Sequence, residues 1–245
     1  MRILALDTSA STATICLAED AICRGAYTVQ TNAHSTTILP MIASLLDGLH
    51  MTIADCDLLA AAAGPGSFTG IRIGVSTVKG LAFSAGIPCV GVSSLAAIAY
   101  GMTGMDGILC PVINARRDHV YTAFFRAVPD ALPERMTEDM QISVEELWAK
   151  IAQLEGPVYA SGDGYAMVHR TSENRPQNLY STPSLYRIPH AYGVAMAGWE
   201  QYRNAADPAV CTGDALVPVY LRKSQAERER DEWIAASGEQ KENIS

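Results

Sequence analysis

Residues 57–74 constrain the fold more than any other part of the sequence. An uninterrupted apolar run over 58–63 leads directly into an eleven-residue string with glycine at positions 64, 66, 70 and 74. A continuous apolar run that ends in a glycine-rich turn is typical of a strand buried on both faces of a parallel sheet. Ile71, Val75 and Val78 then recur at helical spacing. The segment therefore predicts a strand, a tight turn and a helix, which is a building unit of α/β proteins.

The flanking segments extend this α/β pattern into two lobes. Further strands are expected over residues 2–6, 13–18, 21–29, 88–92, 108–113, 120–126 and 158–160. Further helices are expected over 35–49, with Pro40 inside, and over 93–100, 144–154 and 192–202. We expect a first lobe over 1–104 and a second lobe over 105–223. The last helix of the second lobe could pack back on the first lobe. Residues 224–245 are charged and are expected to form a mobile or partner-bound tail.

Composition narrows the class of protein. Of the 245 residues, 49% are hydrophobic and 18% charged, which is enough for a sizeable core. The net charge of −8 disfavours nucleic-acid binding by this chain alone, because that affinity comes mainly from clustered Lys and Arg. Six scattered cysteines without a C-x-x-C pair are expected to be buried reduced thiols. No apolar run is long enough for a signal peptide or a membrane span, so a cytoplasmic location is expected.

Two turns carry acidic residues that could face a phosphate. Asp7, Thr8 and Ser9 follow the first strand, where backbone N–H groups and hydroxyls can meet a nucleotide while the acid orients Mg²⁺ or water. A second such turn follows a later strand and contains Gly162, Asp163 and Gly164. It could face the phosphate from the second lobe, opposite Asp7. Either turn could instead simply satisfy its own backbone, which is the commoner role of such residues.

The glycine-rich string itself has two interpretations. A glycine-rich turn that feeds a helix N-terminus can bind an anion. The string matches neither G-x-x-x-x-G-K-[ST] nor G-x-G-x-x-G, however, and it contains no lysine. The alternative is a tight turn in which Ser67 or Thr69 caps the helix.

The helices expected over 35–49 and 70–84 have wide apolar arcs. Such an arc fits a helix enclosed within its own lobe, and it equally fits an exposed patch that becomes buried against another subunit. Under the second interpretation, Glu at Ile42 or Val75 should block pairing with a modest effect on the isolated fold.

The histidines indicate no metal site. His34, His50, His119, His169 and His190 never fall three or four residues apart, so no helical H-x-x-x-H or H-E-x-x-H pair exists. No G-x-S-x-G motif is present either. No metal and no catalytic residue are therefore assigned.

Three strings together resemble one family. They are ILALDTS at 3–9, HS at 34–35 leading into ILPMI at 38–42, and GPGSFTGIRIG at 64–74. They resemble the TsaB (YeaZ) family of bacterial tRNA threonylcarbamoyladenosine accessory proteins, most closely over residues 1–94. The resemblance implies a two-lobed actin-like, sugar-kinase-like ATPase fold with ribonuclease H-like lobes.

The resemblance also implies a function and partners. The chain would be a non-catalytic scaffold that pairs with a paralogue, TsaD, which transfers threonylcarbamoyl to adenosine 37 of tRNAs reading A-starting codons. The ATPase TsaE would join the complex, and the chain would contact tRNA only through the complex. In the absence of its partners, the chain could form a homodimer. No cofactor of its own is implied, although ATP or ADP could bind at the interface of the complex. The implied partner interface comprises Ile38, Leu39, Ile42, Leu45, Leu46, Phe68, Ile71, Val75 and Val78.

Two enzyme hypotheses compete with the scaffold. The chain could be an ATPase or small-molecule kinase that uses Asp7 and Asp163, although no general base or phosphate-binding lysine is evident. A peptidase is a further option, for which the sequence supplies neither a metal site nor a nucleophile.

Overall fold

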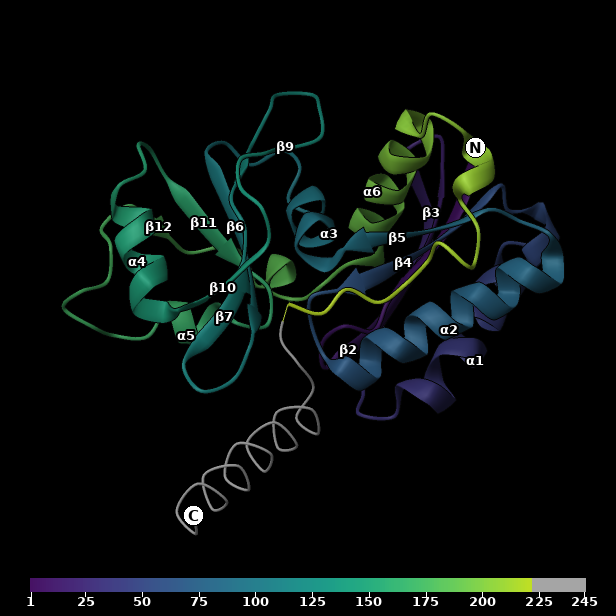
Figure 1. The fold of residues 1–245 in the computed structure, drawn as a ribbon, viewed down its shortest axis with the longest axis horizontal. Helices are drawn as coiled ribbons and strands as arrows, with labels where there is room; N and C mark the ends of the chain where they lie inside the picture. The colour runs from purple at the N-terminus through teal and green to yellow at the C-terminus, as the bar shows by residue number, and fades with distance from the viewer. Residues whose placement is uncertain (222–245) are drawn as a thin grey trace, which may run out of the picture.

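The computed structural model describes residues 1–221 as two lobes, each built on a mixed β-sheet (Figure 1). The predicted tail over 224–245 lies outside the described residues. The chain passes from the first sheet to the second between α3 (Ser94–Tyr100) and β6 (Ile108–Asn114), and residues 104 and 105, where the two expected lobes meet, lie in this connection. No helix within residues 1–221 is both long and apolar enough to cross a membrane.

The first lobe contains a five-stranded sheet in the order β3-β2-β1-β4-β5. Its strands are β1 (Arg2–Asp7), β2 (Thr12–Glu19), β3 (Ile22–Gln30), β4 (Leu58–Gly64) and β5 (Cys89–Ser93). The first three form an antiparallel meander, and β4 and β5 run parallel to β1. The short helix η1 (Ile53–Asp55) precedes β4, and the predicted strands and helices of this lobe are confirmed.

Helices cover both faces of this sheet. On one face, α1 (His34–Gly48) and α2 (Phe68–Ala85) lie side by side (Figure 1). On the other face lie α3 and α6 (Ala191–Asn204), so the last helix does pack back on the first lobe. The α6 backbone approaches closely, because a Cβ on Gly198 would lie 2.9 Å from the Ala60 Cβ.

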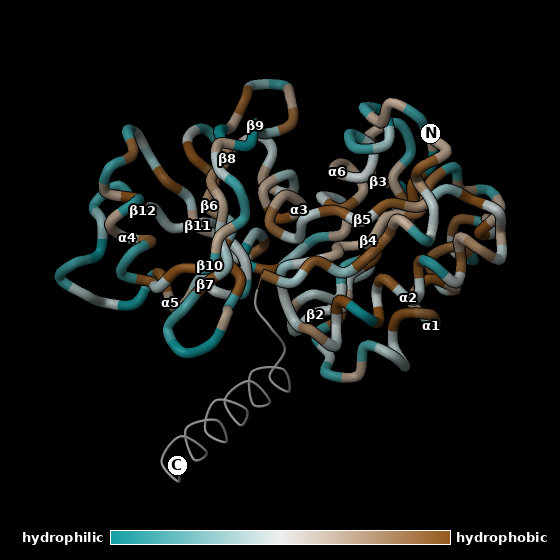
Figure 2. Tube along the Cα trace, in the orientation of Figure 1, coloured by the Kyte–Doolittle hydropathy of each residue, from teal (hydrophilic) through white to brown (hydrophobic). Residues whose placement is uncertain are grey.

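The alternating side chains of β4 explain why this strand is apolar throughout. Leu59, Ala61 and Ala63 join the core beneath α1 and α2, whereas Leu58, Ala60 and Ala62 join the core beneath α3 and α6. The central strands are accordingly among the more hydrophobic parts of the trace (Figure 2). A strand enclosed on both faces has no polar side, as the sequence predicts.

The second lobe repeats the strand order of the first. Its main path is β10-β7-β6-β11-β12, again with an antiparallel meander followed by parallel strands. The elements are β7 (His119–Thr122), β8 (Phe125–Arg126), β9 (Glu134–Arg135), β10 (Met140–Ser143), α4 (Val144–Ala152), β11 (Val158–Ser161), α5 (Tyr165–Val168), β12 (Leu179–Tyr180) and the short helix η2 (Ser184–Arg187). The short helix η3 (Pro208–Val210) follows α6 and lies beside the first lobe, where the Cys89 N–H of β5 donates to the Cys211 carbonyl at 2.9 Å. The two lobes therefore share a strand topology, although the sequence contains no detectable internal repeat.

The strand predicted over 120–126 is interrupted. Its two parts, β7 and β8, pair with β6 in a single antiparallel register that places Ala123 opposite Pro111. Proline has no N–H to donate, so the ladder cannot continue there. The Phe124 N–H instead donates a hydrogen bond of 2.9 Å to the hydroxyl of Thr137, which lies in the segment after β9. The short elements β9, β10 and α5 are not predicted from the sequence.

Candidate functional site

A cavity of about 1090 Å³ lies between the two lobes. Its first-lobe wall is formed by the turn after β1 and by the start of α2, and its second-lobe wall by the β6–β7 hairpin and Asp163. Residues 219–221, which follow α6 in the chain, complete the lining. Ser9 of the Asp7 turn and Asp163 of the second lobe therefore both line this cavity.

The structure brings Asp7 and Asp163 to the same region from different lobes. Asp7 is 1% exposed, and its Oδ1 accepts a bond of 2.6 Å from the Ser9 N–H. Its Oδ2 is buried without a partner among the described residues, and burial raises the pKa of this carboxyl. Asp163 is an exposed residue beside the cavity, and its Oδ1 accepts a bond of 2.9 Å from the Asn114 N–H. Surrounding protein raises the pKa of Asp163, and the charge of Asp7 adds to that effect.

The glycine-rich string is packed against the Asp7 turn. The Thr8 hydroxyl donates to the Gly70 carbonyl at 2.7 Å, and the Ser67 N–H donates to the Ser9 carbonyl at 2.7 Å. A Cβ on Gly70 would lie 1.9 Å from the Thr8 carbonyl oxygen, and one on Gly74 would lie 2.5 Å from the Thr8 hydroxyl. These glycines are explained by close backbone contact between the two loops.

Ser67 caps α2, which favours the structural interpretation of the string. Its hydroxyl accepts a bond of 3.3 Å from the Gly70 N–H. The N–H groups of residues 67 and 70 are therefore already bonded within the protein. The glycines of the Asp163 turn also serve close packing. A Cβ on Gly162 would lie 2.2 Å from the Val112 carbonyl oxygen, and the Gly164 N–H donates to that oxygen at 3.1 Å.

Two polar side chains at the cavity wall have buried atoms without a partner among the described residues. The Ser9 hydroxyl and the His34 Nδ1 are such atoms, in side chains that are 1% and 9% exposed. A small polar molecule in the cavity could complete the hydrogen bonding of both groups. Within residues 1–221, no three His, Cys, Asp or Glu side chains gather closely enough to hold a metal ion.

One cluster at the cavity was missed from the sequence. The Tyr220 ring stacks on Phe68 with ring centroids 4.6 Å apart, and Arg72 donates to the Tyr220 hydroxyl at 2.9 Å. The Val219 N–H donates to the Ala63 carbonyl at 2.7 Å and so adds an extended segment beside the end of β4. The Arg72–Tyr220 contact joins residues 148 positions apart in the sequence, so no local sequence pattern predicts it.

The residues assigned to the partner interface separate into two groups. Seven are at most 7% exposed and belong to the core of the first lobe: Ile38, Ile42, Leu45, Leu46, Ile71, Val75 and Val78. Their assignment to an exposed patch is wrong, because the sheet and the contact between α1 and α2 already cover them. Leu39, in contrast, is 51% exposed, and Phe68 is partly exposed beside Tyr220. Phe83, which was not assigned, is 92% exposed on α2.

Comparison with known proteins assigns the family. The sequence profile described as "TsaD: tRNA N6-adenosine threonylcarbamoyltransferase" matches residues 28–230. The chain is 32% identical to the tRNA threonylcarbamoyladenosine biosynthesis protein TsaB of Bacillus subtilis, over 96% of this chain and 98% of that protein. The chain belongs to the TsaB family. Over most of its length it is thus similar to proteins of tRNA threonylcarbamoyladenosine biosynthesis, as the resemblance of the three sequence strings implies.

Solved structures confirm the fold. YeaZ from Pseudomonas aeruginosa matches with a TM-score of 0.73 at 28% identity, covering 90% of this chain and 99% of that one. Component A of the (R)-2-hydroxyglutaryl-CoA dehydratase of Acidaminococcus fermentans matches with a TM-score of 0.51 at 12% identity, covering 83% and 100%. The second likeness concerns the fold alone. The expected two-lobed actin-like, sugar-kinase-like architecture of the TsaB family is present.

Proposed function

We propose that this TsaB-family chain is a non-catalytic accessory subunit for threonylcarbamoyl transfer to adenosine 37 of tRNA. Its partner would be a TsaD-type threonylcarbamoyltransferase, which would supply the catalytic groups. A TsaE-type ATPase would join the assembly, and tRNA would be held mainly by the partners, because this chain has a net charge of −8. The family assignment supports the pathway, and the surface of two helices supports the role in pairing.

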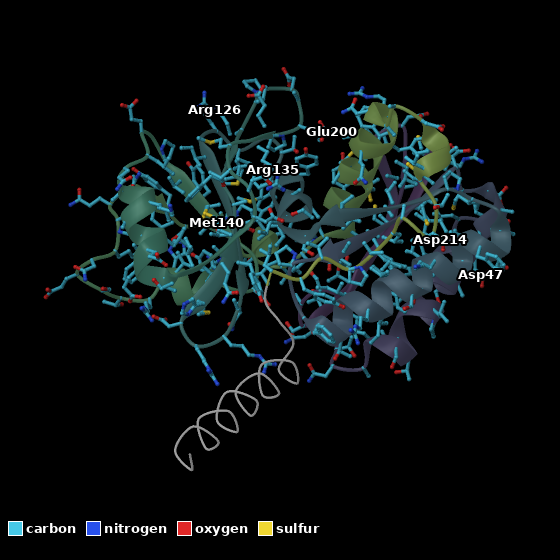
Figure 3. All side chains as sticks on the ribbon, viewed as in Figure 1. Asp47, Arg126, Arg135, Met140, Glu200 and Asp214 are labelled. Carbon is cyan, nitrogen blue, oxygen red and sulfur yellow. The ribbon has the colours of Figure 1, made fainter. Side chains whose placement is uncertain are left out.

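The exposed faces of α1 and α2 are the observation that carries the pairing role. Exposed positions on the two helices include Leu39, Ala43, Ser76, Gly80 and Phe83. Small residues allow another helix to approach closely, and the exposed Leu and Phe supply apolar area that a partner could bury. Asp47, an acidic residue of α1, lies near the end of the helices away from the second lobe (Figure 3). We infer that two helices of the partner pack here and form a helical bundle with α1 and α2.

The cavity geometry supports a non-catalytic role. A phosphate-binding loop needs free N–H groups, but those of Ser67 and Gly70 are bonded within the protein. Asp7 is shut off from solvent, and burial raises its pKa, so it is poorly placed to act as a Mg²⁺ ligand. Any ATP or ADP would accordingly bind at the interface of the complex rather than to this chain alone.

Pairing can be tested by co-elution with a TsaD-type partner in size-exclusion chromatography. We expect the wild-type chain to co-elute, and Phe83→Glu and Leu39→Glu to elute separately, because each places an unpaired charge in the interface. Leu185→Glu is the matched control, since Leu185 is 64% exposed on the second lobe. Co-elution of the Phe83→Glu and Leu39→Glu variants would reject this surface.

A further inference from the structure

Two cysteines of the first lobe lie close together at one end of the meander. Their sulfur atoms, Cys16 Sγ on β2 and Cys23 Sγ on β3, are 3.6 Å apart. The strand register places Cys23 opposite Ala18, two residues from Cys16, so both thiols point to the same face of the sheet. A register shift between Leu17 and Ala18 adds one residue to β3 at this point.

The two thiols differ in access to solvent. Cys16 is fully buried in the core beneath α6, whereas Cys23 is exposed close to the Asp20–Ala21 turn. The other four cysteines, Cys56, Cys89, Cys110 and Cys211, are buried. A soluble oxidant therefore meets Cys23 before any other thiol of this chain.

We propose that Cys16 and Cys23 form an oxidation site that a hydroperoxide converts to an intramolecular disulfide. The Cys23 thiolate attacks one peroxide oxygen, the O–O bond breaks, and the leaving hydroxide takes a proton to become water. Cys16 sulfur then attacks the Cys23 sulfenic acid, the S–O bond breaks, and the hydroxyl leaves as water with the Cys16 proton. Two thiols and one hydrogen peroxide thus give one disulfide and two waters.

The burial of Cys16 makes Cys23 the thiol that is oxidised first, and the short distance between the two sulfur atoms makes Cys16 the thiol that resolves it. Burial, together with the neighbouring Cys23, raises the pKa of the Cys16 thiol, so it stays protonated and unreactive toward oxidants in bulk solvent. Its nearest sulfur is that of Cys23, and only a short movement is needed to bring the two atoms to bonding distance. Tyr192 of α6 donates its hydroxyl to the Ala21 carbonyl at 2.9 Å and helps to close the inner side of the pair.

The test is peroxide treatment of the full-length chain followed by peptide mass mapping without reduction. The expected product is a linked pair of peptides containing Cys16 and Cys23, with the mass of two hydrogens lost. Cys16→Ala should instead leave a Cys23 sulfenic acid that dimedone labels, and Cys23→Ser should lose the reaction altogether. Cys56→Ser, which removes a buried thiol elsewhere in the lobe, should still form the link.

Other products would overturn the proposal. Dimedone labelling of wild-type Cys23 at the level of Cys16→Ala would show that Cys16 does not resolve the sulfenic acid. A disulfide between two chains through Cys23, or oxidation of Cys23 to sulfinic acid with no link, would also reject the pair. The test is independent of the pairing function, because it uses this chain alone.

Discussion

At the scale of single residues, the polar turns beside the cavity pack closely against the glycine-rich string. One interpretation of the sequence places the Asp7 turn opposite the Asp163 turn, and the structure shows that Ser9, the glycine-rich string and Asp163 all line the cavity between the lobes. What a sequence cannot reveal is whether backbone N–H groups remain free. Here the turn at Thr8 and Ser9 occupies the space that the glycines leave open.

Gly70→Ala and Gly80→Ala test this packing within one helix. The methyl group of Gly70→Ala would press on the Thr8 carbonyl, so we expect the free energy of unfolding to fall by about 1–3 kcal/mol or more. At Gly80 nothing lies within 4 Å of an added Cβ, so Gly80→Ala should raise the free energy of unfolding by up to about 1 kcal/mol. Urea unfolding of both variants measures the difference. Equal effects would refute the close contact.

Asp7→Asn tests the burial of the carboxyl. Burial raises the pKa of Asp7 in the folded chain, so ionisation costs stability above the ordinary aspartate pKa of about 3.9. Asn keeps an acceptor for the Ser9 N–H without the charge. We therefore expect Asp7→Asn to raise the free energy of unfolding at neutral pH, and this gain to shrink as the pH falls toward 4. A gain that persisted unchanged at low pH would contradict this explanation.

At the scale of elements, the strand and helix pattern of the first lobe is predictable, because its periodicities are strong. The partner face of α1 and α2 is not, since an apolar arc looks the same whether it is covered by its own sheet, by a neighbouring helix or by another protein. Only the fold shows that Ile42 and Val75 point inward and Leu39 and Phe83 outward. In the second lobe, β9 and β10 lie in a stretch with little periodicity, and their pairing partners β8 and β7 come from earlier in the chain.

Val75→Glu and Phe83→Glu should separate folding from pairing. Val75 is 3% exposed, so Glu there buries an unpaired charge and should destabilise the lobe itself by several kcal/mol. This corrects the expectation of a modest effect at Val75 or Ile42. Phe83→Glu, at a side chain that is 92% exposed, should leave the thermal unfolding midpoint nearly unchanged. A large loss of stability in Phe83→Glu would show that Phe83 supports the lobe.

At the scale of the whole molecule, the lobes are joined by elements that cross between them. The last helix returns from the second sheet to cover the first, and the core beneath it includes Phe125 and Leu109 of the second lobe. The Tyr100 hydroxyl donates to Glu200 of α6, which lies on the same side of the molecule as Arg135 of β9 (Figure 3). We therefore expect the described part of the chain to behave as one rigid body, which would present α1 and α2 to a partner as a fixed surface.

The central claim is that this chain supports threonylcarbamoyl transfer by pairing rather than by its own chemistry. The most direct measurement is tRNA modification by TsaD-type and TsaE-type partners with a source of threonylcarbamoyl-adenylate, in the presence of the wild-type chain, Phe83→Glu or Asp7→Ala. The account predicts that Phe83→Glu abolishes modification together with co-elution, and that Asp7→Ala, once shown to be folded, supports it nearly as well as the wild type. Full modification with Phe83→Glu, or complete loss with a folded and paired Asp7→Ala, would contradict it.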